Sequence, residues 1–177
     1  GFDKENCQMN DGKCDKQGNF LFGSMDKLES RPIGSLYRLN SQKKIETLLK
    51  GVVISNGPAF SNNGKTMYFS DSFNRKILKF NYNGESKFNE NYEVFYTFEK
   101  EDNAPDGACV DSEDRVWVAV WGGSKIIGIN KLGEKVSEVK VPTENVTSCC
   151  FGGTSFKELY ITTARKNILN LSCSSNI

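Results

Sequence analysis

One pattern recurs four times along this sequence, and the recurrence constrains the fold more than any other feature. Each copy has a polar residue followed by an anchor residue, then a short apolar stretch, then a turn rich in Gly, Asn, Asp and Ser. The anchors are Gly12, Gly57, Gly107 and Cys149, with separations of 45, 50 and 42 residues. Strand-like repeats of this length are typical of the blades of a β-propeller.

The segments between the anchors have the composition of short strands. After the turns come runs of aromatic and β-branched residues, which favour a pleated and packed surface. Two further strand-like segments follow each of the first three runs, and helical periodicity is scarce. The runs are 20–22, 67–69, 116–120 and 159–162, and the later pairs are 36–39 with 45–49, 77–82 with 92–98, and 125–129 with 135–141. We therefore predict an all-β propeller, because an open antiparallel sandwich would not explain the matched anchors.

The fourth copy is incomplete, because the pattern is lost after Arg165. We assign residues 1–166 to a partial propeller of about three and a half blades, and residues 167–177 to a divergent tail. Propellers usually have four or more blades. The chain is therefore expected to form part of a larger ring, or an open arc whose edges associate with a partner or with another copy.

The composition excludes several kinds of mechanism. The chain has no histidine, so it holds no Ser-His-Asp triad, no Cys-His pair and no histidine-rich metal site. Any metal must be held mainly by oxygen, which favours calcium, magnesium or manganese. The net charge of +1, with acids and bases interspersed, suggests neither a nucleic-acid nor an anionic-membrane partner. No apolar run is long enough to span a bilayer.

The six cysteines show no Cys-x-x-Cys pair, and most lie within apolar strand patterns. We interpret them mainly as small buried apolar residues of a protein in a reducing compartment, which predicts a cytoplasmic location. Two N-glycosylation sequons, which begin at Asn145 and Asn170, leave secretion as the alternative.

The residues directly before the anchors suggest a shared site. They are Asp11, Asn56, Asp106 and Ser148. The first strand of each propeller blade lines the central channel, so equivalent side chains converge on one axis. Two carboxylates in a narrow opening repel each other unless a cation offsets them, and a hard divalent cation suits oxygen ligands. The alternative is that Asn-Gly and Asp-Gly are only turn dipeptides, but their recurrence favours a common site.

Several motifs resemble one known family. They are "NDGKCDKQGNFLFGSM", "GSLYRLN", "ISNGPAFSNNGKTMYFSDS", "PDGACVDSEDRVWVAVWGG" and "TSCCFGG…ELYITTAR". In this order they resemble senescence marker protein (regucalcin), gluconolactonase and luciferin-regenerating enzyme, over nearly all of residues 6–166. The resemblance implies a propeller of the six-bladed type that binds one divalent cation and hydrolyses sugar lactones or, in some members, related small esters. Calcium is the favoured ion, with zinc, manganese and magnesium as alternatives.

The resemblance also implies roles for particular residues. Asn56 and Asp106 are expected to bind the metal, and Asn10 and Asp11 to contact the substrate, with Glu29 as a further candidate. The cation would polarise the lactone carbonyl and lower the pKa of a water molecule, and Asp106 would act as the general base.

The chain departs from the family pattern at several positions. The third metal ligand of the family, a glutamate in the first blade, has no counterpart in these residues. Gln8 stands where an arginine is frequent. Trp121 either walls the site or packs within a blade. These departures leave two alternatives to a lactonase: a non-catalytic calcium-binding regulatory propeller, or an inactive truncated form.

Overall fold

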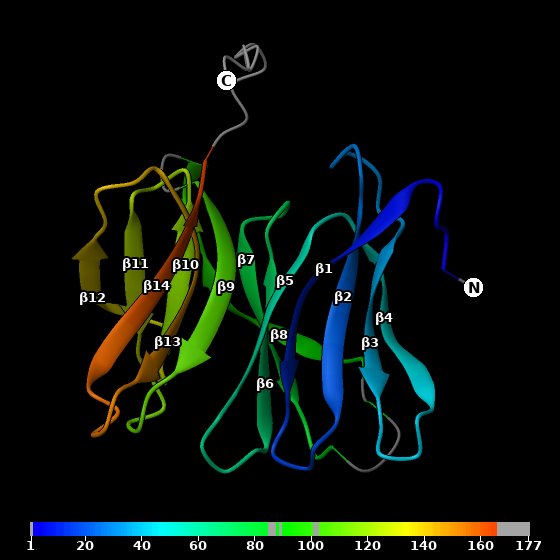
Figure 1. Cartoon of the computed structure of the whole chain (residues 1–177), viewed down its shortest axis with the longest axis horizontal. Helices are drawn as coiled ribbons and strands as arrows, with labels where there is room; N and C mark the ends of the chain where they lie inside the picture. The colour runs from blue at the N-terminus through cyan, green and yellow to red at the C-terminus, as the bar shows by residue number, and fades with distance from the viewer. Residues whose placement is uncertain (1, 85–87, 89, 101–102, 166–177) are drawn as a thin grey trace, which may run out of the picture.

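The computed structural model describes residues 2–84, 88, 90–100 and 103–165. The described residues form fourteen strands in four antiparallel sheets, and none of them lies in an α-helix (Figure 1). The first sheet contains β1 (Cys7–Cys14), β2 (Phe20–Asp26), β3 (Gly34–Leu39) and β4 (Ile45–Val52). The second contains β5 (Ser55–Phe60), β6 (Thr66–Asp71), β7 (Lys76–Asn81) and β8 (Tyr92–Thr97).

The third and fourth sheets continue the same order. The third contains β9 (Ala104–Val110), β10 (Val116–Trp121), β11 (Lys125–Ile129) and β12 (Lys135–Lys140), and the fourth contains β13 (Asn145–Gly152) and β14 (Glu158–Ala164). The predicted strands are therefore confirmed, with ends that differ by a few residues. The predicted tail, residues 167–177, lies outside the described residues.

The first strand of every sheet is its inner strand. β1 packs against β5, β5 against β9, and β9 against β13. Among the last strands of the complete sheets, β8 and β12 are mostly exposed, and β4 is exposed over half of its residues. The sheets follow one another in chain order across Figure 1, from β1–β4 on the right to β9–β14 on the left. Over the described residues, this arrangement is a partial β-propeller with three complete blades and half of a fourth, as the repeat predicted.

The apolar core lies between successive sheets, because strand residues alternate between the two faces of a blade. In β6, Met67 and Phe69 pack with Leu21 and Leu36 of the first sheet. Tyr68, which lies between them in the sequence, packs instead with the third sheet. A smaller cluster with Ala119 and Val146 joins the third sheet to the fourth. These three layers hold the inner strands beside one another.

A register irregularity interrupts each inner strand next to its anchor. The pairing of β1 with β2 shifts between Met9 and Gly12, and that of β5 with β6 shifts between Asn56 and Ala59. The pairing of β9 with β10 shifts opposite Asp106, and the pairing of β13 with β14 shifts directly before Ser148. An extra residue at such a bulge changes the direction in which the side chains point. The Asn-Gly and Asp-Gly pairs thus lie within strands, and the alternative that they form turns is wrong.

The cysteines only partly match their prediction. Cys7, Cys109 and Cys149 are buried, whereas Cys14 and Cys150 are exposed, and all five are free thiols. Alternation explains the difference at 149 and 150, since neighbouring strand residues face opposite sides. Cys173 and the second sequon lie outside the described residues, and Asn145 of the first sequon is buried. The described part of the chain contains no helix with the length and hydropathy needed to cross a membrane.

Candidate metal and substrate site

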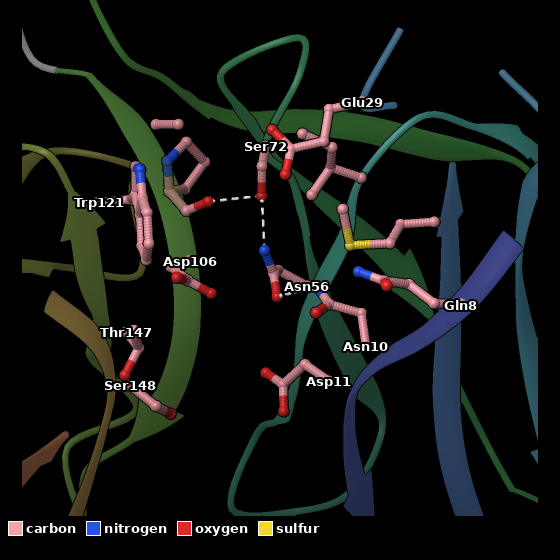
Figure 2. Close-up of a pocket in the computed structure, with 14 residues that line it drawn as sticks. Gln8, Asn10, Asp11, Glu29, Asn56, Ser72, Asp106, Trp121, Thr147 and Ser148 are labelled. Atoms are coloured by element: carbon pink, nitrogen blue, oxygen red, sulfur yellow. Dashed lines mark hydrogen bonds between the residues drawn. The ribbon is translucent and has the colours of Figure 1, made fainter. Parts of the chain in front are cut away.

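A cavity of about 440 Å³ opens between the inner strands, at the end where the bulges lie. Figure 2 shows its lining side chains, contributed by β1, β5, β9, β13 and the adjoining turns. All five residues that the sequence assigned to the site line this cavity: Asn10, Asp11, Glu29, Asn56 and Asp106. Ser148, the fourth residue before an anchor, lines it as well. The structure therefore brings together side chains that are up to 138 positions apart in the sequence.

Asn56 lies on β5 and is only 6% exposed. Its Nδ2 donates to the hydroxyl of Ser72 at 2.9 Å, and its Oδ1 accepts from Nδ2 of Asn10 at 2.7 Å. A carbonyl oxygen has two acceptor sites, so Oδ1 retains one for a further ligand. Asn56 can therefore offer a fixed, neutral oxygen to the cavity.

Asp106 lies on β9, and its carboxylate faces across the cavity toward Asn56 and Asp11 (Figure 2). Burial and, to a smaller extent, the negative charge of Asp11 together raise the pKa of Asp106 to about 7, although the hydrogen bond from the backbone N–H of Gly107 acts in the opposite direction. Both raising effects penalise an ionised carboxylate that has no cation beside it. The electrostatics of this position thus favour a bound positive charge.

Asp11 has a different environment. One of its carboxylate oxygens accepts from the backbone N–H of Gly12 at 2.7 Å, and the other accepts from that of Gly57 at 2.9 Å. Asp11 therefore joins β1 to β5 in addition to facing the cavity. Its charge contributes to the field at Asp106, whereas its oxygens are already partly used by the backbone.

Asn10 and Glu29 are exposed residues at the edge of the cavity. Both N–H groups of the Asn10 side chain are used, one by Asn56 and one by the carbonyl of Ser55 at 2.8 Å. Its Oδ1 is therefore the atom left to accept a hydrogen bond from a ligand. Glu29 lies in the turn after β2, where its backbone has a positive φ of 53°. Trp121 is 40% exposed and also lines the cavity, in agreement with the interpretation that it walls the site.

The sequence interpretation missed Ser72 and Thr147, which also line the cavity. Ser72 directly follows β6, the antiparallel partner of β5. The end of one strand in such a hairpin lies beside the start of the other. A polar residue just after the second strand of a copy was therefore the signal that could have identified Ser72.

Comparisons with known proteins identify the family of the chain. The sequence model described as "SMP-30/Gluconolactonase/LRE-like region" matches residues 2–165. The chain belongs to this family. Regucalcin from Sus scrofa is 36% identical over 173 residues, with 94% of this chain and 58% of the relative covered. Regucalcin from Xenopus laevis is 37% identical, with 92% and 56% covered.

Solved structures of the family agree with the fold. A luciferin-regenerating enzyme superposes with a TM-score of 0.85 at 35% identity, covering 96% of this chain and 58% of that one. A calcium-binding protein, regucalcin from Agrobacterium tumefaciens, superposes with a TM-score of 0.87 at 25% identity, covering 93% and 56%. The chain thus spans less than two thirds of the length of these relatives.

The residues at the cavity suit the hard divalent cation that the family resemblance implies. The lining offers carboxylate and amide oxygens, which are ligands for such ions. Within the described part of the chain, no three His, Cys, Asp or Glu side chains cluster closely enough to hold a metal by themselves. A cation here would therefore rely on the Asn56 amide as well as on Asp106, with the remaining positions open to water or substrate.

The raised pKa of Asp106 predicts a pH dependence of stability in cation-free buffer. The folded-state pKa of about 7 lies above the ordinary value of 3.8, so the folded chain binds more protons between these pH values. Its stability should therefore fall as the pH rises through this window, by about 2 kcal/mol between pH 5 and 8. Thermal melting with a chelator should show this loss for the wild type and not for Asp106→Asn. Parallel pH curves for the two proteins would contradict the assignment.

Proposed function

We propose that the protein is a divalent-metal-dependent hydrolase that acts on small sugar lactones. The observation that carries the proposal is the meeting of Asn56 and Asp106 at one cavity, beside Asn10 and Asp11. Membership of a family whose description includes gluconolactonase supports the choice of substrate class. Calcium is the favoured ion, since one structural relative at 25% identity is described as calcium-binding; zinc, manganese and magnesium are the alternatives.

Asn56 and Asp106 would hold the cation through their side-chain oxygens. When bound, such an ion acts as a Lewis acid toward a carbonyl oxygen and makes a nearby water more acidic. Asp106 would accept the proton of the attacking water at its carboxylate, as a general base. The Asp106 carboxylate faces the open space of the cavity, which is where a substrate would bind in this proposal (Figure 2).

The other lining residues would bind and orient the lactone. Oδ1 of Asn10 is free to accept a hydrogen bond from a sugar hydroxyl, and the Glu29 carboxylate at the edge can do the same. Asp11 holds β1 to β5 through Gly57 and adds a third acceptor. The half-exposed indole of Trp121 offers an apolar wall on which the carbon face of a sugar ring can pack.

A non-catalytic calcium-binding propeller is the second candidate. The observation that favours it is Gln8, which lines the cavity where the family resemblance leads one to expect an arginine. A neutral amide binds a polar substrate less strongly than a guanidinium does. In this case the cation would stabilise the inner strands without a reaction.

Two measurements on the 177-residue chain separate the candidates. After treatment with a chelator, the chain is incubated with gluconolactone-type substrates and calcium, zinc, manganese or magnesium. A lactonase gives hydrolysis above the spontaneous rate with at least one ion, together with a higher melting temperature in that ion. A melting shift without hydrolysis supports the calcium-binding candidate, and neither effect with any ion contradicts both.

We also propose a cytoplasmic location. The thiols of Cys109 and Cys149 lie 3.7 Å apart and form a hydrogen bond rather than a disulfide, which suits a reducing compartment. Fractionation of cells that produce the protein would test this placement.

A further inference from the structure

Ser72 connects the candidate metal ligand Asn56 to Pro105, the residue before the other candidate ligand, Asp106. It is 5% exposed and directly follows β6, beside the start of β5. Its hydroxyl donates to the backbone carbonyl of Pro105 at 2.6 Å and accepts from Nδ2 of Asn56 at 2.9 Å. Figure 2 shows both bonds as dashed lines. Ser72 therefore connects the side chain of Asn56 to the residue just before Asp106.

The chemistry of this bridge fixes which way the Asn56 amide points. A backbone carbonyl is only an acceptor, so the Ser72 proton must be directed at Pro105. The serine oxygen can then only accept from Asn56, which requires the NH₂ group of the amide to face Ser72. The carbonyl Oδ1 is consequently directed to the opposite side, where Asn10 donates to it. Asn10, whose own NH₂ group is fixed by the Ser55 carbonyl, supports the same orientation from the other side, and Ser72 is the group that holds the NH₂ end of the Asn56 amide.

The bridge also holds the backbone next to Asp106. Pro105 has a fixed φ and no N–H, so its carbonyl is the hydrogen-bonding group by which this residue can be tied. Ser72 is itself anchored, because its N–H donates to the carbonyl of Ile54 at 3.3 Å and its carbonyl accepts from Arg75 at 3.1 Å. A shift of the second blade relative to the third would therefore break the bridge.

Neighbouring serines show that burial of a hydroxyl here does not by itself create such a bridge. Ser55 and Ser70 are also buried, and among the described residues their hydroxyls have no hydrogen-bond partner. Ser70 lies two positions before Ser72 and therefore provides a control in the same segment.

We propose that Ser72 is a positioning residue of the cavity: it holds the Asn56 oxygen and the Asp106 backbone in the arrangement that binds a divalent cation. Ser72 does not touch the cation or the substrate in this role. The inference rests on the proposed function for its effect on the cation, whereas the orientation of Asn56 can be tested without any metal.

The first test measures cation affinity in the folded chain. Chloride salts of calcium, zinc, manganese and magnesium are titrated by calorimetry into the wild type, Ser72→Ala and Ser70→Ala. Loss of a residue that orients a metal ligand typically weakens affinity 10–100-fold, and we expect about this loss for Ser72→Ala. Ser70→Ala should stay within about twofold of the wild type. Equal affinities in the two variants would overturn the proposal.

The second test follows the Asn56 side chain directly, without metal. In the wild type its NH₂ protons should give a distinct NMR signal pair with slowed exchange, because one of them is bonded to Ser72. Ser72→Ala should abolish this protection, and Ser70→Ala should preserve it. Unchanged protection in Ser72→Ala would overturn the positioning role. A wild type that binds none of the four ions contradicts the proposed function, and the NMR result then decides the role of Ser72 by itself.

Discussion

Asp106→Asn should remove nearly all metal-dependent hydrolysis while leaving the chain folded. The substitution keeps the size of the side chain and removes the charge that faces Asn56 across the cavity (Figure 2). Loss of a general base typically costs about 10²–10⁴-fold in rate, and the same carboxylate is here a candidate ligand. We expect a rate at the lower detection limit and cation affinity weakened by more than about 100-fold, beyond the loss typical of an outer-shell partner.

The measurement combines initial rates of lactone hydrolysis with calorimetric titration of the cation. Asp114→Asn is the matched control, because Asp114 lies in the turn at the other end of the same inner hairpin. Its carboxylate accepts from the backbone of Asn62 and pairs with Lys131. This control should lose some stability and retain both activity and affinity. An Asp106→Asn protein with wild-type affinity would remove Asp106 from the metal site.

Asp106→Asn should also be more stable than the wild type in cation-free buffer at pH 8. This follows from the raised pKa, because the ionised carboxylate destabilises the folded chain. Higher stability with lower activity is the expected behaviour of a binding site whose charges are arranged for a ligand rather than for folding.

The blade architecture could be predicted from the sequence because it depends on repetition. Anchors at a spacing of about 45 residues, followed by β-rich runs, define the inner strands β1, β5 and β9 without knowledge of any contact. The same equivalence brought Asp11, Asn56 and Asp106 to one cavity, since corresponding positions of successive blades face one axis. The roles of these residues in binding and catalysis stay predictions until the variants are measured.

Features that depend on contacts between blades could not be read from the sequence. The bridging role of Ser72 depends on the carbonyl of Pro105, which is 33 positions away in the sequence and belongs to the next blade. Likewise, Asn56-Gly57 looks like a turn by composition, and only the packing of β5 against β9 explains the glycine inside a strand. Local patterns give the elements, whereas the close approach of two inner strands is a property of the assembled propeller.

Gly57→Val, next to the candidate ligand Asn56, should cause a large loss of stability. Gly57 has a positive φ of 41°, which a β-branched residue adopts only with strain. A Cβ atom at this position would lie 2.9 Å from the backbone nitrogen of Ala108 and 2.9 Å from the carbonyl oxygen of Asp106. Backbone strain and forced contacts each cost about 1–3 kcal/mol, so we expect a loss of about 3 kcal/mol or more.

Thermal melting measures this loss, which corresponds to a decrease of about 6–12 °C in a chain of this size. Gly18→Val is the control, since Gly18 has a positive φ of 82° and no atom lies within 4 Å of the place that its Cβ would take. It carries the backbone strain alone and should lose about 1–2 kcal/mol. The difference between the two variants isolates the contact of β5 with β9. Because that contact includes the carbonyl of Asp106, Gly57→Val should also weaken cation binding, whereas Gly18→Val should not. Equal losses of stability in the two variants would mean that β5 and β9 can move apart without a cost in free energy.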